Sequence, residues 1–184
     1  RAGVPVRLFG FKQDITEQKL SADRTRYRAE FDRMTGLANR SVFDERLAQL
    51  SESGALFLVD LDGFKAINDT YGHAVGDVCL QEAARRLRAA CQETDLVAHI
   101  GGDEFAVLVE READGPFCEA IGRRIVAAMR DPYHHRGVCL RFGASVGIAR
   151  AAASAPADLF TRADAALYAA KAAGRGTLRM ALPR

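Results

Sequence analysis

The chain has 184 residues, 48% of them hydrophobic, which is enough for one domain with a substantial core. A formal net charge of +2 is too close to zero to indicate a nucleic-acid or membrane surface by itself. No apolar run approaches the roughly 20 residues that cross a bilayer, and four widely spaced cysteines without a Cys-x-x-Cys pair disfavour a zinc site or a disulfide framework. We expect a cytoplasmic domain with no nucleic-acid or membrane contact of its own, taken from a longer chain because it begins with Arg1 rather than Met.

The N-terminal region divides into an apolar and a charge-rich stretch. Residues 1–13 end in a loosely alternating apolar pattern that is typical of a strand. Residues 15–34 have a helical pattern in which Leu20, Tyr27 and Met34 recur every seven residues. Such a short stripe fits an amphipathic helix lying on its own domain and, equally well, a parallel stalk that pairs two chains. The sequence leaves both alternatives open.

Downstream, helical and extended patterns alternate as in a mixed α/β domain. Predicted helices cover residues 41–50, 75–91, 116–129 and 158–173, and predicted strands cover residues 55–62, 96–100, 105–109, 138–142, 145–149 and 178–181. The first of these strands is almost wholly apolar, which predicts burial on both faces.

Two acidic clusters interrupt the apolar strands. Residues 101–104 (Gly-Gly-Asp-Glu) are a predicted hairpin tip, and the buried strand ends with Asp60 and Asp62 on one face. Taken alone, a solvated turn explains the first cluster and a salt bridge to an arginine explains Asp60. If Asp60 and Asp103 meet on adjacent strands, their oxygens offer ligands to Mg²⁺, which in nucleotide sites also keeps waters and phosphate oxygens.

The residues that follow the acidic strand suit a nucleotide. Residues 63–65 (Gly-Phe-Lys) form a turn into a helix, where free N–H groups bind anions, although the Walker pattern is absent. The Asp77 carboxylate matches the adjacent donors of guanine, and Asn68 can add an amide hydrogen bond. Helix capping is a common role for both residue types, and spacing alone favours capping over guanine binding.

Two cations lie near the end of the last predicted helix. Lys171 and Arg175 are four residues apart and together can clamp a phosphate. Cations at a helix C-terminus also stabilise the helix dipole without any ligand, so their position alone does not decide between the two roles.

Together these segments resemble the GGDEF family of diguanylate cyclases over about residues 30–182. The matching motifs are Asp32–Arg40, Asp60–Asp69, Gly72-His73, Gly76-Asp77, Gly101–Phe105, Ala163–Lys171 and Gly174-Arg175. The resemblance implies an α/β (α+β) fold with a mainly antiparallel central sheet ringed by helices, similar to the palm domain of polymerases and nucleotide cyclases. It also implies three parts: the tail of an upstream PAS sensor domain (1–13), a signalling helix (14–33) and the GGDEF domain (34–184).

The activity implied by the resemblance joins two GTP molecules into cyclic di-GMP and releases pyrophosphate, in a homodimer whose domains each hold one GTP. Asp60, the Leu61 carbonyl and Asp103 would hold Mg²⁺, which Mn²⁺ can replace. Asp103, with Glu104 beside it, would activate the attacking 3′-hydroxyl. The residues that would bind the substrate are Phe64, Lys65, Lys171 and Arg175 at the phosphates and Asn68 and Asp77 at guanine.

The chain departs from the family pattern in three places. The inhibitory product site Arg-x-x-Asp is replaced by Gln92-Glu93-Thr94-Asp95, so we expect no product inhibition through it. His99 stands where an arginine is common, which puts the local packing in doubt, and Gly176 replaces a more usual polar residue. A GTP-binding regulatory or dimerisation domain without turnover is the alternative function; the intact acidic residues favour the enzyme.

Overall fold

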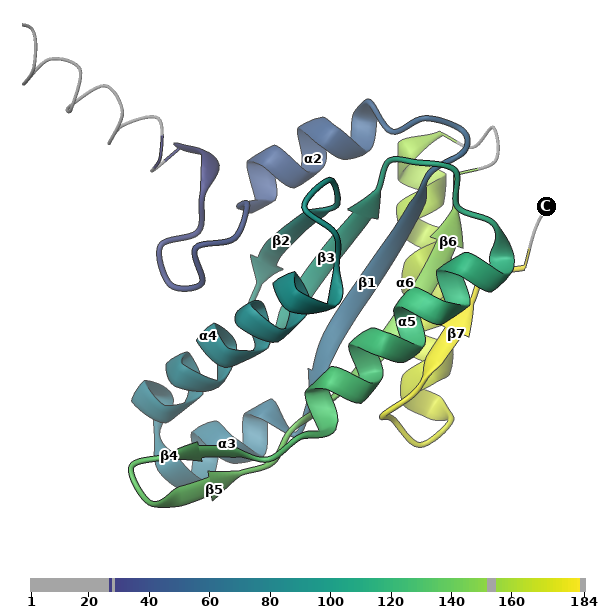
Figure 1. The fold of residues 1–184 in the computed structure, drawn as a ribbon. Coiled ribbons are helices and arrows are strands. Elements are labelled where there is room, and N and C mark those ends of the chain that lie inside the picture. The colour runs from purple at the N-terminus through teal and green to yellow at the C-terminus, as the bar shows by residue number, and fades with distance from the viewer. Residues whose placement is uncertain (1–26, 28, 152–154, 183–184) are drawn as a thin grey trace, which may run out of the picture.

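The computed structural model describes residues 27, 29–151 and 155–182. Helices and strands alternate along these residues (Figure 1). In chain order they are α2 (Arg40–Ala48), β1 (Ala55–Asp62), α3 (Phe64–Tyr71), α4 (His73–Ala90), β2 (Leu96–Gly101), β3 (Glu104–Val109), α5 (Gly115–Arg130), β4 (Tyr133–His135), β5 (Val138–Leu140), β6 (Gly143–Arg150), α6 (Pro156–Ala172) and β7 (Leu178–Met180). No helix in the described ranges is both long and apolar enough to cross a membrane.

A five-stranded sheet in the order β2-β3-β1-β6-β7 forms the centre of the domain (Figure 1). The neighbouring strands are antiparallel except for the parallel pair of β6 and β7. β1 occupies the middle position and is buried along almost its whole length, as its apolar sequence predicts. The predicted fold class, a mainly antiparallel sheet ringed by helices, is therefore confirmed.

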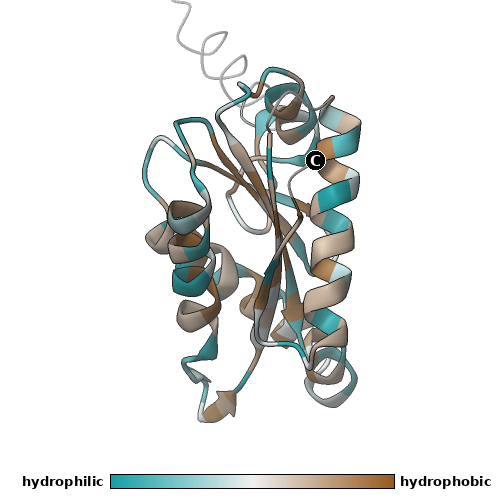
Figure 2. Cartoon of the chain, turned by 90° about the vertical axis from the view of Figure 1, so that its right-hand side faces the viewer, coloured by the Kyte–Doolittle hydropathy of each residue, from teal (hydrophilic) through white to brown (hydrophobic). Residues whose placement is uncertain are grey.

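Alternation along β1 divides the core between the two faces of the sheet. Phe57 and Val59 pack in a cluster that includes residues of α4 and α5, whereas Leu56 and Leu58 pack in a cluster that includes residues of α2 and α6. Figure 2 shows the largely hydrophobic strands running between helices on both sides. Because Asp60 has the parity of Leu56 and Leu58, the same alternation directs it toward the α6 face.

The close packing of α6 on the sheet depends on Gly147 in β6. A Cβ atom at this position would lie 2.2 Å from the carbonyl oxygen of Ala163, so any side chain would push the helix away. The approach brings the C-terminal end of α6 next to the end of β1. Residues far apart in the sequence meet there.

The predicted strand at residues 138–142 lies outside the central sheet. β5 pairs with β4 in a separate two-stranded hairpin, and the chain turns between them at Arg136 and Gly137, both with positive φ. Positive φ at both turn residues matches a tight two-residue hairpin connection. The sequence does not predict β4 because its Tyr-His-His segment has no apolar alternation.

The predicted strand at residues 1–13 and most of the predicted helix at residues 14–33 lie outside the described residues. Tyr27, Ala29 and Glu30 are helical, and Phe31 then forms an antiparallel bridge with Ala38. Met34, the last residue of the heptad stripe, therefore follows the end of the helix.

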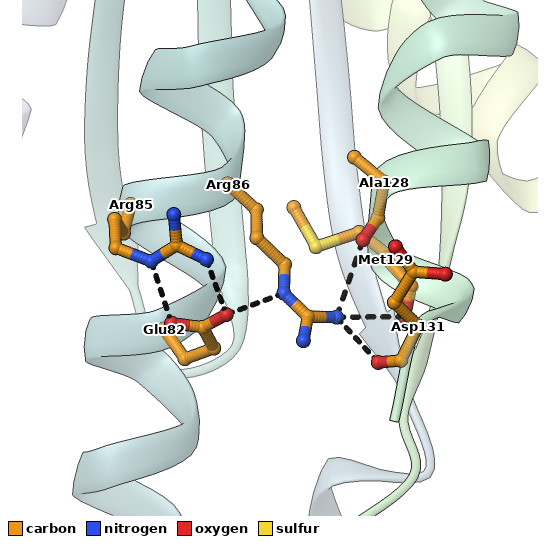
Figure 3. A network of polar contacts seen from close by, with 6 residues as sticks. All are labelled: Glu82, Arg85, Arg86, Ala128, Met129 and Asp131. Atoms are coloured by element: carbon orange, nitrogen blue, oxygen red, sulfur yellow. Dashed lines mark hydrogen bonds and ion pairs between the residues drawn. The ribbon is translucent and has the colours of Figure 1, made fainter. Parts of the chain in front are cut away.

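A buried ion-pair network joins α4 to the end of α5 (Figure 3). The guanidinium of Arg86 donates to Glu82 at 2.7 Å and to the carbonyl oxygens of Ala128 at 3.2 Å and Asp131 at 2.7 Å. The hydrogen bond from Arg85 lowers the pKa of Glu82 most, and burial opposes this effect. The hydrogen bond from Arg86 adds to the lowering, so the pKa of Glu82 lies below its usual value. Arg86 thus satisfies carbonyl groups at the C-terminal end of α5 that a helix leaves without partners.

Replacing Arg86 by Met is expected to lower the free energy of unfolding by about 3 kcal/mol, because the carbonyl groups of Ala128 and Asp131 lose this partner and the buried Glu82 keeps only the exposed Arg85. Urea unfolding followed by circular dichroism measures this loss. Arg85→Met is the matched control: its side chain binds the same Glu82 but is 67% exposed, so its loss should be clearly smaller. Equal losses in the two variants would contradict the assignment of Arg86 as the structural partner.

Candidate active site

The turn between β2 and β3 brings Asp103 to the end of β1. Gly101 and Gly102 have φ values of +140° and +57°, which glycine adopts readily. The Leu61 amide donates to the Asp103 carbonyl oxygen at 3.1 Å. Both backbone groups of a strand residue point to the same side, so the Leu61 carbonyl also faces this turn. Asp103 lies in the turn, as the predicted hairpin tip implies, directly before β3 begins at Glu104.

Asp60 lies at the same strand end and is almost completely buried, with 9% exposure. It is directly opposite Glu104 in the pairing of β1 and β3, so the two carboxylates share a face of the sheet. The Lys171 ammonium, from the last turn of α6, contacts Asp60 Oδ2 at 2.6 Å. Burial raises the pKa of Asp60; the hydrogen bond and charge of Lys171 oppose the rise, and the negative charges of Asp103 and Asp62 add to it.

Asp62 also belongs to the acidic cluster at the end of β1, together with Asp60, Asp103 and Glu104, but the predicted site residues do not include it. It accepts hydrogen bonds from the Ser145 hydroxyl and the Gly176 amide, both at 2.8 Å, and Arg175 lies 3.9 Å away. The alternation of strand residues places Asp62 on the same face as Asp60, which could have indicated that it belongs to the site. Nothing in the sequence indicates that Ser145, 83 residues away, binds Asp62. Gly176, a departure from the family pattern, supplies a backbone donor that fixes this carboxylate.

The turn after β1 leads directly into α3. Gly63 precedes the helix with φ of +83°, and Phe64 and Lys65 are its first two residues. The amides of a first helical turn have no partners within the helix and can receive an anion. Lys65 is exposed, and Phe64 is partly buried against the core. The structure thus places both predicted phosphate-binding residues one turn beyond the acidic strand end.

Asn68 and Asp77 lie close together where α3 meets α4. A Cβ atom on Gly76 would lie 1.9 Å from Asn68 Oδ1, so this contact requires glycine. Asn68 Oδ1 is buried and has no hydrogen-bond partner among the described residues. A buried amide atom without a partner costs about 1–3 kcal/mol, which a ligand with donors and acceptors can offset. Asp77, next to Gly76, is exposed and can receive such a ligand.

The donor set at the end of β1 fits a hard divalent cation. The carboxylates of Asp60 and Asp103 and the Leu61 carbonyl offer oxygen atoms only, and the effect of Asp103 on the pKa of Asp60 shows that negative charge accumulates there. In the described ranges, no three acidic, histidine or cysteine side chains already form a metal cluster. Two carboxylates with one carbonyl suit Mg²⁺, which completes its shell with water and phosphate.

His99, which stands where the family often has an arginine, is held in place by contacts of both ring nitrogens. Its ring nitrogens contact Asp32 Oδ1 at 3.1 Å and the Gly102 carbonyl oxygen at 3.0 Å. Burial would raise the pKa of Asp32, but hydrogen bonds from Thr35 and His99 outweigh it and lower the pKa. His99 therefore links the segment after the N-terminal helix to the Gly-Gly turn, a contact that the sequence analysis missed.

Asp95, the acidic residue at the end of the segment Gln92–Asp95, is not free to bind a ligand. The Asp95 side chain is fully buried, binds the Arg111 guanidinium and accepts a hydrogen bond from the Gln92 amide at 2.9 Å. The residue that remains of the Arg-x-x-Asp pattern is thus engaged within the protein.

Comparison with known proteins identifies the family. The family model "Diguanylate cyclase, GGDEF domain" matches residues 29–177. The chain is 36% identical over 183 residues to "Probable diguanylate cyclase DgcE" of Escherichia coli, covering 94% of this chain and 16% of that protein. It is 39% identical over 165 residues to "Diguanylate cyclase TpbB" of Pseudomonas aeruginosa, covering 84% of this chain and 38% of that protein. The chain thus spans well under half the length of these two curated relatives.

Solved structures agree in fold. The coiled coil and GGDEF domain of DgcB from Caulobacter crescentus, in complex with c-di-GMP, matches with a TM-score of 0.82 and 27% identity over 91% of this chain and 94% of that one. The GGDEF domain of TpbB (YfiN) from Pseudomonas aeruginosa matches with a TM-score of 0.78 and 39% identity over 83% and 94% of the two chains.

A mainly antiparallel sheet with carboxylates at the end of its central strand and at the neighbouring hairpin turn defines an α/β domain of the nucleotide-cyclase class. Within that class, the chain belongs to the GGDEF family of diguanylate cyclases.

Proposed function

We propose that this domain condenses two GTP molecules into cyclic di-GMP and releases pyrophosphate. The observation that carries the proposal is the meeting of three features at one end of β1. These are Asp60 with Asp103, the turn into α3, and the buried Oδ1 of Asn68, which has no hydrogen-bond partner in the described ranges. They correspond to the metal, the phosphates and the base of a nucleoside triphosphate.

Each residue has a role that follows from its chemistry. Asp60, the Leu61 carbonyl and Asp103 hold Mg²⁺ or, in its place, Mn²⁺; when bound, the ion supplies positive charge that stabilises the reacting phosphate. Asp103, with Glu104 beside it, accepts the proton of the 3′-hydroxyl. The 3′-oxygen then bonds to the α-phosphorus, the bond from that phosphorus to the β-phosphate oxygen breaks, and pyrophosphate leaves.

The substrate contacts are divided between three elements. At the start of α3, Phe64 and Lys65 present backbone amides and an amine to the phosphates, and Lys171 and Arg175 approach from the end of α6. Asp77 accepts the adjacent guanine donors, which adenine does not offer, and Asn68 adds an amide contact.

The reaction requires a homodimer. Each domain has one set of these groups and holds one GTP, so both new bonds form only when two domains face each other. In this proposal the segment at residues 14–33 is the signalling helix that pairs the chains. Residues 1–13 are the end of an upstream PAS sensor domain, and residues 34–184 are the catalytic domain.

The alternative is a domain that binds GTP and regulates a partner without turnover. Incubation of the purified protein with GTP and Mg²⁺, followed by chromatography and mass spectrometry, separates the two functions. Cyclic di-GMP and pyrophosphate are expected, with a rate that rises more than linearly with protein concentration because two domains must meet. GTP binding without product at any protein concentration would favour the regulatory domain.

Cyclic di-GMP is not expected to inhibit the reaction through residues 92–95. Gln92 lacks the planar fork of arginine, and Asp95 is engaged by Arg111. Initial rates with and without added cyclic di-GMP measure this, and Gln92→Ala is the matched variant. Inhibition of the parent that Gln92→Ala relieves would contradict the prediction.

A further inference from the structure

Lys171 makes a contact that its proposed phosphate-binding role does not require. Its ammonium lies 2.6 Å from Asp60 Oδ2, although the two residues are 111 positions apart. Asp60 is also one of the proposed ligands of the divalent cation. An ammonium group and a divalent cation bound to one buried carboxylate repel each other, so the contact with Lys171 opposes metal binding at Asp60.

The balance of charge around Asp60 shows why an ammonium group is held there. Asp62 and Asp103 act on Asp60 as negative charges, and Glu104 lies opposite it on the neighbouring strand. The nearby Arg175 is directed to Asp62, at 3.9 Å, and its side chain is 64% exposed. Within the described part of the chain, Lys171 is thus the cation that directly compensates the buried Asp60.

We propose that Lys171 is a resident counter-ion that occupies Asp60 until the phosphates of the nucleotide draw it away. This inference rests on the proposed function of the site. The Lys171 side chain is 32% exposed and ends in a compact charge on a flexible stem, so it can turn from a carboxylate to a phosphate without movement of α6. The transfer vacates Asp60 for the divalent cation.

The consequence is positive coupling between the nucleotide and the metal. Without nucleotide, a divalent cation must displace the ammonium from Asp60 and binds weakly. With nucleotide, the ammonium has a new partner and the carboxylate is open. Because such coupling is reciprocal, the metal also strengthens nucleotide binding. Removal of the ammonium should therefore increase the affinity for the metal in the absence of nucleotide.

The test compares Mn²⁺ binding by the nucleotide-free parent and the Lys171→Met variant, measured by electron paramagnetic resonance. The variant is expected to bind Mn²⁺ about tenfold more tightly, a typical coupling factor. Arg179→Met on β7 is the control for a distant loss of positive charge and should resemble the parent. Lys171→Gln is a second variant that also lacks the ammonium and should change affinity in the same direction.

A separate measurement establishes the site itself. Calorimetry with 3′-deoxy-GTP and Mg²⁺ detects nucleotide binding without reaction, because the attacking hydroxyl is missing. If the parent binds this nucleotide but both Lys171 variants bind Mn²⁺ no more tightly than the parent, the counter-ion role is overturned and the proposed function stands. If the parent binds neither the nucleotide with Mg²⁺ nor Mn²⁺, both proposals are overturned.

Discussion

Substitution of Asp103 by Asn is expected to reduce the rate of cyclic di-GMP synthesis by about a thousandfold, with little change in thermal stability. In the proposed mechanism Asp103 is a negatively charged metal ligand and accepts the 3′-hydroxyl proton, and about 4 kcal/mol of lost transition-state stabilisation corresponds to a thousandfold lower rate. Stability should persist because the Asp103 side chain lies in a turn, where its backbone carbonyl, unchanged by the substitution, makes the contact with Leu61. Product formation and Tm are the two measurements.

Glu52→Gln is the matched control for this variant. Glu52 is exposed and lies before β1, at the opposite end of that strand from the acidic cluster, so the same loss of one negative charge should leave the rate unchanged. A rate for Asp103→Asn within a few-fold of the parent would contradict the metal and proton roles of Asp103. A large fall in Tm would instead show that the side chain is structural.

Substitution of Asp77 by Asn is expected to lower kcat/KM for GTP by about 100-fold and to weaken the preference for GTP over inosine triphosphate. In the proposed site the Asp77 carboxylate accepts hydrogen bonds from two adjacent guanine donors, and an asparagine amide would replace one acceptor with a donor. Loss of hydrogen bonds to a charged group, about 1.5–3 kcal/mol, corresponds to this factor. Inosine triphosphate lacks the exocyclic amino group, so the parent should use it poorly and the variant should lose that distinction.

The exposure of Asp77 makes this variant informative, because its folding should be unaffected. Glu112→Gln, at an exposed position after β3, controls for the change in charge. Rates with both nucleotides measure specificity separately from overall activity. An unchanged ratio of kcat/KM values between GTP and inosine triphosphate would show that Asp77 does not read the base.

The architecture of the domain could largely be predicted from local patterns. The continuous apolar run of β1 predicts a strand buried on both faces, and its burial in the middle of the sheet confirms this. The helices α4, α5 and α6 follow the helical periodicity that the sequence shows. Of the β4–β5 hairpin, the sequence predicts the strand that contains β5 but not β4, because the Tyr-His-His segment of β4 shows no apolar alternation.

The candidate site could be predicted only as a set of separate pieces. Motif and spacing identify Asp60, Asp103, Asn68 and Asp77 as chemical groups, but each also has a simple structural explanation. The missing information is the partner of each group. Among the described residues Asn68 Oδ1 has no hydrogen-bond partner and lies against Gly76, which favours a ligand over a capping role. This contact between α3 and α4 can be seen only in the folded structure.

The sequence by itself determined the family, the buried strand β1 and the chemical groups available at its end, because these follow from residue types and from the local periodicity of the chain. Only the tertiary structure decided which charges meet. In the folded domain Lys171 contacts Asp60, and Gly176 and Ser145 donate hydrogen bonds to Asp62. His99 contacts both Asp32 and Gly102. The physical reason is that the packing of α6 on the sheet and the tight hairpin turn set these distances, and neither leaves a regular spacing in the sequence.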